Sequence, residues 1–408
     1  MKHQPLLRDG HQVKLLQGSA EFFPELIRAI DAARSHIQFE TYIFDFHGPA
    51  AQVAFALERA GIRGLRVWIV VDGVGTPQLS EDWRLRFDKA GVEWRTYSPL
   101  GALGLLIPSR WRRLHRKLCV IDGQLAFCGG INILDDLYDP QYGSLKAPRL
   151  DFAVCATGAL VQQVQEACTQ LWWRLQAVKH VRQQNFPEAF SSFKAAGVHF
   201  PWLHQSSSKS QQWVARAGLL LRDNVLHRSQ IEKAYLKAIA TARHEIVIAN
   251  AYFLPGRKLR QALVMAAARG VKVRLLLQGR YEYFMQYHAA RPVYRQMLDA
   301  GVEIFEYTQS FLHAKVAVVD AHHERPWATV GSSNLDPISL LLAREANVVV
   351  ADGHFAQNLH DALTMAMAQD SLQILPQTLK ERSQFLRALD WMAFGLMRFA
   401  IWLTGNRY

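Results

Sequence analysis

The sequence predicts an α/β fold built from a duplicated domain, with two mixed β-sheets flanked by helices. Two observations lead to this prediction. Helical segments alternate with short apolar strands along the chain, which is typical of α/β architectures. The same order of elements then recurs in the two halves of the 408-residue chain. The repeating unit is too long for a solenoid, so the pattern indicates a duplication.

The repeat is visible as matched segments. Each half reads as helix, strand, helix, strand, helix, short strand and then a strand bearing a histidine. The matches are AIDAARSHIQFETYIF (29–44) with AIATARHEIVIANAYF (238–253), RGLRVWIVVDG (63–73) with RGVKVRLLLQG (269–279), and AGVEW (90–94) with AGVEI (300–304).

Polar, serine-rich LHQSSSKSQQ has the composition of a linker and predicts the domain boundary. We therefore expect an N-terminal domain over 1–202, a linker over 203–212, a C-terminal domain over 213–380 and a tail over 381–408. The N-terminal sequence has no continuous apolar stretch and predicts neither a signal peptide nor an N-terminal transmembrane helix.

The formal net charge of +12 favours an anionic partner, either nucleic acid or anionic lipid, and does not choose between them. The four cysteines show no zinc-ligand spacing and two lie in apolar runs, which predicts buried, reduced thiols in a protein that faces the cytosol.

The strongest signal is a motif that occurs twice, H-x-K-x4-D, followed in each half by G-[G/S]-x-N. Its occurrence at matching places in a duplicated chain makes chance a poor explanation. The motif residues are His115, Lys117, Asp122 and Asn132 in the first half, and His313, Lys315, Asp320 and Asn334 in the second.

The spacing predicts a phosphate site. Residues i and i+2 of a strand share a face, so each histidine should project beside its lysine. If the halves pair about a pseudo-twofold axis, two histidines, two lysines and two asparagines line one active site at the interface. One histidine can attack phosphorus to form a phosphohistidine, while the other protonates the leaving alcohol. The lysines supply positive charge, so no metal or cofactor is predicted.

Carboxylates are expected to support this site. Asp151 and Glu345 follow the two motifs at comparable places and are predicted to orient the histidines; the alternative is ordinary charges at strand ends. Asp122 and Asp320 are expected to have a structural role on backbone or lysine. The glycines after each motif should let the backbone approach a ligand.

Two segments suggest contact with a membrane. The insert LGALGLLIPSRWRRLH is apolar and then basic, and predicts an anionic-surface contact through Arg110, Trp111, Arg112 and Arg113, unless it is a solvated loop. The aromatic tail is too short and broken to span a bilayer. It predicts an interfacial amphipathic helix with Trp391 and Trp402 near the headgroups and with Arg387, Asp390 and Arg398 on the polar side. The alternative is a helix packed on protein.

These motifs, with ETYIF, IANAYF-x-PG and GSSNLDPISL, resemble the phospholipase D superfamily over nearly the whole chain. Within it the sequence is similar to bacterial cardiolipin synthases of the shorter type, called cardiolipin synthase B. The resemblance implies transfer of a phosphatidyl group from phosphatidylglycerol to a second phosphatidylglycerol, giving cardiolipin and glycerol. It also implies His115 as nucleophile, His313 as acid and base, Ser333 at the phosphate, and Asp336 and Ser339 bracing the site.

The resemblance further implies a peripheral protein on the cytosolic face of the bacterial inner membrane, with anionic phospholipid as partner and no nucleic acid. Three rival functions remain open. They are a hydrolase or a transferase using phosphatidylethanolamine or another alcohol, a nuclease of the same superfamily, and an inactive lipid-binding scaffold. The oligomeric state is not predicted.

Overall fold

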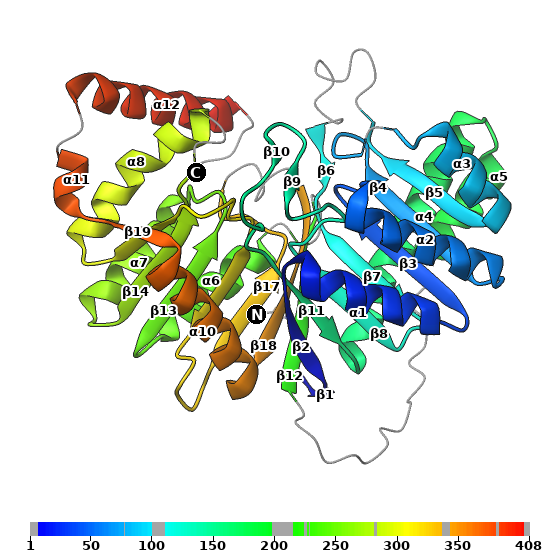
Figure 1. Cartoon of the computed structure of the whole chain (residues 1–408), viewed down its shortest axis with the longest axis horizontal. Coiled ribbons are helices and arrows are strands. Elements are labelled where there is room, and N and C mark those ends of the chain that lie inside the picture. Colours follow the sequence, from blue (N-terminus) through cyan, green and yellow to red (C-terminus); the bar gives the residue numbers. More distant parts are fainter. Residues whose placement is uncertain are drawn as a thin grey trace. The chain divides into compact units, whose positions relative to one another are not determined.

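The chain was examined as a computed structural model, which describes residues 7–76, 78–99, 111–197, 215–223, 227, 229–280, 284–336, 343–380 and 383–403. It forms two compact units, each with its own β-sheet (Figure 1). The first unit contains Leu6–Asp135 together with Ala153–Leu219. The second contains Asp136–Phe152 and the chain from Leu220 onward.

The first unit is built on a seven-stranded mixed sheet. Strands β3, β4 and β5 are parallel, whereas β7 is antiparallel to β3 and to β8, and β8 is antiparallel to β11. The strand order is β2 (Val13–Gln17), β11 (Phe152–Ala156), β8 (Leu125–Gly129), β7 (Lys117–Ile121), β3 (His36–Thr41), β4 (Arg66–Asp72) and β5 (Val92–Tyr97).

The second unit repeats this arrangement, so the predicted duplication and mixed sheets are confirmed. Strands β13, β14 and β15 are parallel, and β16, β17 and β18 continue the sheet antiparallel. The strand order is β18 (Ala343–Ala351), β17 (Trp327–Gly331), β16 (Lys315–Val319), β13 (Glu245–Asn250), β14 (Lys272–Gln278), β15 (Glu303–Tyr307) and β19 (Ser371–Ile374). Strand β12 (Ala215–Arg222) begins in the first unit, where it pairs with β1 (Arg8–His11).

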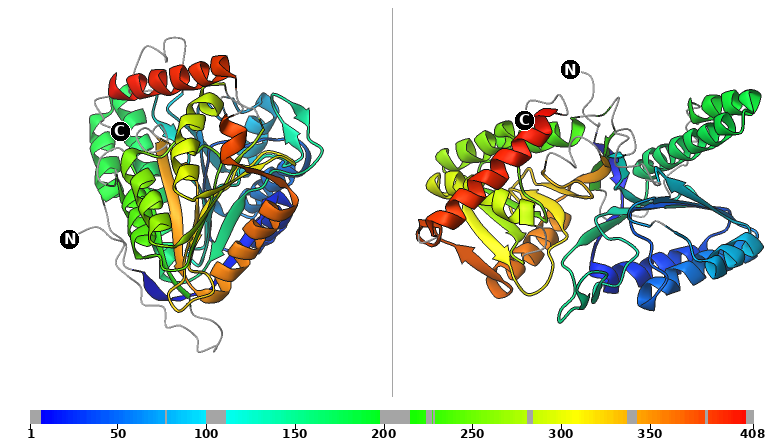
Figure 2. Two further views of the ribbon diagram at one scale, coloured as in Figure 1. Left: turned by 90° about the vertical axis from the view of Figure 1, so that its left-hand side faces the viewer. Right: turned by 90° about the horizontal axis from the view of Figure 1, so that it is seen from above.

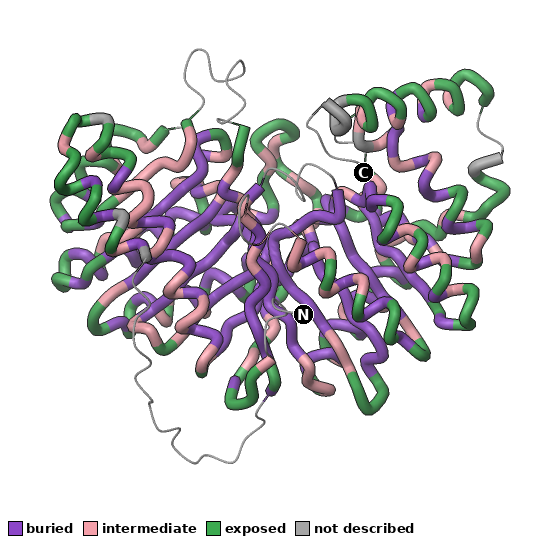
Figure 3. The backbone as a smooth tube through the Cα atoms, turned by 180° about the vertical axis from the view of Figure 1, so that it is seen from behind, coloured by how far each residue is buried: buried purple, intermediate pink, exposed green. Residues whose placement is uncertain are grey.

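Helices cover both faces of each sheet, so the central strands are largely buried (Figure 3). In the first unit, α1 (Gly18–Ala32), α2 (Gly48–Ile62) and α3 (Glu81–Ala90) share one core on one face. Helix α4 (Ala159–Arg182) packs on Trp68 and Val70 of β4, and α5 (Phe186–Gly197) packs against α4. The corresponding helices of the second unit are α6 (Gln230–Thr241), α7 (Arg257–Ala268), α8 (Phe284–Asp299) and α10 (Gly353–Gln369).

The remaining elements are short, apart from the last helix. They are β6 (Arg113–Leu114), β9 (Tyr138–Asp139), β10 (Gly143–Ser144), α11 (Pro376–Lys380) and α12 (Gln384–Leu403). Over the described part of the chain, no helix is both long enough and apolar enough to cross a bilayer. The four cysteines are buried and free, as expected, and burial raises the pKa of Cys128 and of Cys155 to about 12.

The division into units does not follow the order of the chain. Segment 136–152 precedes the linker in sequence but groups with the second unit. There it forms the β9–β10 hairpin, and Leu150 makes a parallel bridge to Leu312. The predicted linker at 203–212 lies outside the described residues.

The last residue of each motif joins two strands through the backbone. The Asp122 carboxylate accepts hydrogen bonds from the N–H groups of Arg34 (2.8 Å), Ser35 (2.8 Å) and His36 (3.0 Å) at the start of β3. Asp320 accepts from Arg243 (2.9 Å), His244 (2.8 Å) and Glu245 (2.9 Å) at the start of β13. Both aspartates have left-handed backbone, with φ of 53° and 50°. Both carboxylates therefore bind backbone N–H groups at the opposite strand end from the histidines.

We predict that Asp122→Asn lowers the free energy of unfolding by about 2 kcal/mol at neutral pH, since charged acceptors form stronger hydrogen bonds. Burial acts to raise the pKa of Asp122, but hydrogen bonds from Arg34, His36 and Ser35 outweigh it and lower that pKa. The stabilisation therefore exists above the unfolded-state pKa and is lost as pH falls through the folded-state value.

Urea denaturation at neutral and at acidic pH measures this effect. The difference between wild type and Asp122→Asn should shrink in acid. Asp88→Asn, on the exposed side of α3 in the same unit, is the matched control and should leave stability unchanged. An equal effect of the two variants would contradict the role assigned to Asp122.

Candidate functional site

In the first unit the motif histidine lies just before strand β7, not within it. Lys117 is the first residue of β7, is buried, and donates from Nζ to the His115 carbonyl at 2.6 Å. The ring of Tyr42 lies 5.1 Å from the His115 ring, and Lys117 Nζ lies 5.6 Å from the centre of that same tyrosine ring. Tyr42 is therefore a site residue to which the sequence assigned no role, although it belongs to the ETYIF segment.

Arg116, the residue between His115 and Lys117, anchors the first motif. Arg116 is buried and forms an ion pair with Glu40 of β3, with Nη2 2.8 Å from Oε1. It also donates to the carbonyl of Ala167 on α4 at 2.9 Å. Both corresponding positions in the second unit, Ala314 and Ala249, are buried alanines. One copy therefore fixes its motif with an internal ion pair, and the other with apolar packing.

In the second unit the motif histidine is held by the segment 136–152. The His313 N–H donates to the Leu150 carbonyl at 2.9 Å, and His313 Nδ1 lies 2.6 Å from Oδ2 of buried Asp151. A carboxylate on Nδ1 holds a proton there, so Nε2 is the nitrogen that can give up or take a proton during a reaction. Lys315, fully buried, donates to the His313 carbonyl, as Lys117 does to His115. The predicted Asp151 does contact a motif histidine, but it is the histidine of the second motif.

Glu345 has a different environment. It is completely buried, and its Oε2 accepts a hydrogen bond from Ser332 Oγ at 2.5 Å. Ser332 in turn accepts from the Ala346 N–H at 3.1 Å. No role was predicted for Ser332, although the sequence shows a serine there where the first copy has Gly130.

Buried asparagines of the second unit have amide atoms without a hydrogen-bond partner among the described residues. Asn132 accepts the Ile43 N–H on Oδ1 at 3.2 Å, while Asn334 is buried and its Oδ1 has no hydrogen-bond partner among the described residues. Asn250, directly opposite Lys315 in the β13–β16 pairing, is completely buried. Its Oδ1 accepts the Leu335 N–H at 3.1 Å and its Nδ2 has no partner within the described ranges. Buried amide atoms without a partner are uncommon in folded proteins, and these two lie in the second motif and on the strand that pairs with it.

Three residues of the GSSNLDPISL segment behave differently from one another. Ser333 is buried, and its hydroxyl lies 3.4 Å from the Asn334 carbonyl. Gly331 has no room for a Cβ, which would lie 2.3 Å from the side chain of Asn347. This glycine therefore permits close packing of β18, not the approach of a ligand that the sequence suggested. Ser339 lies outside the described residues.

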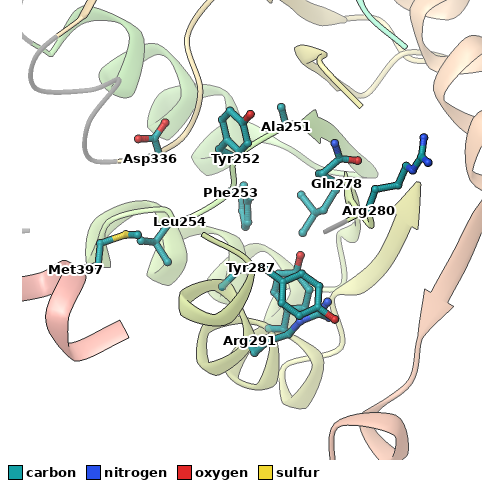
Figure 4. A pocket seen from close by; sticks show the side chains of 13 residues that line it. Ala251, Tyr252, Phe253, Leu254, Gln278, Arg280, Tyr287, Arg291, Asp336 and Met397 are labelled. Atoms are coloured by element: carbon teal, nitrogen blue, oxygen red, sulfur yellow. The ribbon is translucent and has the colours of Figure 1, made fainter. Parts of the chain in front are cut away.

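A cavity of about 50 Å³ lies beside the second motif, where β13 and β14 end (Figure 4). Asp336 and Arg280 supply charge, whereas Phe253, Leu254 and Met397 supply apolar wall. Gln278 of the same wall accepts the Leu312 N–H at 3.2 Å, directly before His313. The pocket thus borders α8 and, through Met397, α12, and His313 is not among its lining residues.

The basic insert, which was predicted to contact an anionic surface, is only partly exposed over its described residues. Trp111 and Arg112 are exposed, and Arg110 lies outside the described residues. Arg113 departs from the prediction of a membrane contact, because its Nη1 lies 3.0 Å from buried Asp72 and its Nη2 donates to the Ser98 carbonyl at 3.1 Å. Burial raises the pKa of Asp72 despite this ion pair. The arginine is held inward by a carboxylate 41 residues away in sequence.

The C-terminal helix presents an apolar face outward. Helix α12 lies along α8 (Figure 2), where Asp390 Oδ1 is 2.6 Å from His288 Nδ1 and both side chains are buried. Asp390 therefore does not belong to a water-facing side, which corrects the predicted helical wheel. Arg387 and Arg398 are exposed, and the side chain of Trp402 is not described. The large apolar side chains exposed on this helix are Phe385, Trp391, Met392, Leu396 and Phe399.

The chain is similar to known proteins over nearly its whole length. The family model described as cardiolipin synthase, PLD-like domain, matches residues 26–144 and 235–367. The chain is 34% identical to cardiolipin synthase B of Escherichia coli K12 over 98% of its own length and 90% of the relative's. It is 28% identical to the cardiolipin synthase of Listeria welshimeri, over 94% of this chain and 74% of that protein.

Among solved structures, phosphatidylserine synthase of Haemophilus influenzae shares the fold, with a TM-score of 0.66 at 14% identity over 98% of this chain and 97% of that one. Both copies of the motif fall inside or beside the matched ranges, and both retain histidine and lysine. The chain therefore belongs to the cardiolipin synthase family of the phospholipase D superfamily.

Proposed function

We propose that the protein is a phosphatidyltransferase that makes cardiolipin from two molecules of phosphatidylglycerol, releasing glycerol. The observation that carries this proposal is His313, whose Nδ1 is held by Asp151 at 2.6 Å and whose carbonyl receives the buried Lys315 ammonium. The same lysine-to-histidine contact recurs at His115. The proposal unites the two motifs in one active site.

In the first step His115 attacks the phosphorus of one phosphatidylglycerol. A phosphorus–nitrogen bond forms and the bond to the glycerol oxygen breaks. His313 donates the proton that the leaving glycerol needs. Lys117 and Lys315 stabilise negative charge on the other phosphate oxygens, together with the amides of Asn132 and Asn334.

In the second step the headgroup hydroxyl of another phosphatidylglycerol enters. His313, now with a free Nε2 lone pair, takes its proton, and the oxygen attacks phosphorus while the bond to His115 breaks. Asp151 holds the proton on Nδ1 throughout, which keeps the acid–base nitrogen directed at the reaction. One phosphodiester replaces another, so the exchange requires no energy source.

The lipid substrate requires access to a bilayer, and we assign that contact to α12. Phe385, Trp391, Leu396 and Phe399 face outward on a helix whose inner side is fixed to α8 by the Asp390–His288 pair. Exposed Arg387 and Arg398 add positive charge for anionic headgroups. Trp111 and Arg112 give a second contact. This describes a peripheral protein on the cytosolic face of the bacterial inner membrane.

The principal alternative keeps the phosphohistidine and changes the acceptor. Water would make the protein a phospholipase D, and phosphatidylethanolamine or another alcohol would make it a different transferase. The acceptor depends on which molecule occupies the pocket near Asp336 and Arg280 and on the exclusion of water. A nuclease is less consistent with a 34% identical cardiolipin synthase relative and with the apolar face of α12.

We predict cardiolipin and glycerol from phosphatidylglycerol vesicles and purified protein, in EDTA, with lipids read by mass. His115→Ala and His313→Ala should each lower the rate by at least about 10³-fold, because each removes a reacting group. His354→Ala, exposed on α10, is the control and should retain activity. Phosphatidic acid as sole product would make the protein a hydrolase, and cleavage of single-stranded DNA without lipid turnover would overturn the proposal.

We predict that Asp151→Asn lowers kcat by about 10²–10⁴-fold with little change in KM, since a misoriented imidazole still binds lipid. Asp151→Glu should restore part of the activity. Asp139→Asn, which removes the partner of Arg149 from the same segment, is the matched control. Equal losses in Asp151→Asn and Asp139→Asn would point to folding of the segment instead of histidine orientation.

We predict that Leu396→Asp weakens binding to phosphatidylglycerol vesicles at least about tenfold in a flotation assay, because it places a charge in the apolar face. Met365→Asp introduces the same charge at an exposed methionine of α10 and should bind like wild type. Activity on a water-soluble, short-chain phosphatidylglycerol should survive in both. Indistinguishable vesicle binding by the two variants would exclude α12 as the contact.

A further inference from the structure

A group of nitrogen and oxygen ligands lies at the other end of the second sheet from His313. His322 is in the loop between β16 and β17, and His360 and Asp361 are neighbours on α10. His322 Nε2 is 3.2 Å from His360 Nδ1, which is 3.1 Å from Asp361 Oδ1. All three ligand atoms lie within 4.8 Å of one another. The proposed phospholipid chemistry uses none of them.

The spacing fits a transition-metal ion. Ligands at 2.0–2.1 Å in a tetrahedron are separated from one another by about 3.4 Å. Two edges of the group, at 3.2 and 3.1 Å, are already close to that separation. His322 and Asp361 are exposed while His360 is buried, so an ion would be reached from solvent and could keep water as a fourth ligand.

A neighbouring carboxylate orients the central histidine. His360 Nε2 lies 2.9 Å from Glu245 Oε2, and Glu245 is itself paired with Arg274, at 2.8 Å. When Nε2 donates to Glu245, Nδ1 has its lone pair directed at His322 and Asp361. A histidine that donates its other nitrogen to a carboxylate is the usual arrangement at protein-bound zinc. Arg274 Nη2 lies 3.1 Å from His360 Nε2. Its positive charge is therefore at the opposite ring nitrogen from Nδ1 and is offset by the Glu245 carboxylate.

The loop that carries His322 is fixed in place. It begins at Asp320, whose carboxylate caps the start of β13, and the His323 N–H donates to the Asp320 carbonyl at 3.1 Å. The His323 ring stacks on His244, with centroids 3.5 Å apart. The first unit provides an internal comparison. Its shorter turn, from Asp122 to Leu125, carries no histidine, and a His36–Gln165 contact lies at the start of β3.

We propose that His322, His360 and Asp361 form a binding site for a divalent transition-metal ion such as Zn²⁺. The donors are two imidazoles and one carboxylate, a set that suits zinc, cobalt or nickel better than magnesium or calcium. The ion would join the β16–β17 loop to α10 and so stabilise the second unit. It takes no part in phosphatidyl transfer.

The test is titration of the full-length protein, free of any histidine tag, with Zn²⁺ by calorimetry and with Co²⁺ by visible spectroscopy. We expect one ion per chain and a melting temperature that rises with zinc. His322→Gln, an exposed position that leaves the fold intact, should weaken binding at least tenfold, as should Asp361→Asn. His323→Gln, the adjacent histidine that is not a ligand, should bind like wild type.

Absence of stoichiometric zinc uptake, or equal affinity in His322→Gln and His323→Gln, would overturn the proposal. The double variant His115→Ala/His313→Ala should retain zinc, and loss of binding there would place the ion at the motif histidines instead. Cardiolipin formation in EDTA reports on the proposed function alone, so the two proposals can fail independently.

Discussion

Each unit depends on one carboxylate that gathers three backbone N–H groups at the start of a central strand. Asp122 and Asp320 stand in a left-handed turn that ordinary residues avoid, and the hydrogen bonds at β3 and β13 offset that strain. The turn fixes the end of the motif strand against its neighbour. Because register along a strand propagates to its other end, the position of the histidine and lysine follows from this contact. The third motif residue therefore acts at a distance from the chemistry.

The sequence allowed the architecture to be predicted because its signals are local. Matched strands and helices, and the spacing H-x-K-x4-D, led directly to two mixed sheets with equivalent motif strands. Each lysine donates to the backbone carbonyl of its histidine, and both histidines precede their strands, whereas the spacing predicted two side chains projecting together from one strand. The predictions that were wrong concern residues whose contacts are made by residues far away in sequence. Arg113 reads as a surface charge until Asp72 is placed beside it, and Gly331 reads as a ligand contact until Asn347 occupies the space.

The prediction for the C-terminal helix was wrong for the same reason, because it also depended on a residue far away in sequence. A helical wheel groups Asp390 with the two arginines as a polar side. The pairing with His288, 102 residues earlier, places that aspartate inward and the aromatic side chains outward. Burial of a carboxylate is tolerated because the imidazole satisfies it. Periodicity identifies an amphipathic helix, but not which of its sides the protein covers, since that depends on what α8 offers.

Segment 136–152 limits how a chain of this kind can be divided during evolution. It is encoded in the first half, yet Asp151 reaches the histidine of the second motif. The second copy thus does not itself contain the carboxylate that holds its histidine. A fission of the gene at the linker would separate that histidine from its carboxylate, so the two halves are bound to be inherited together.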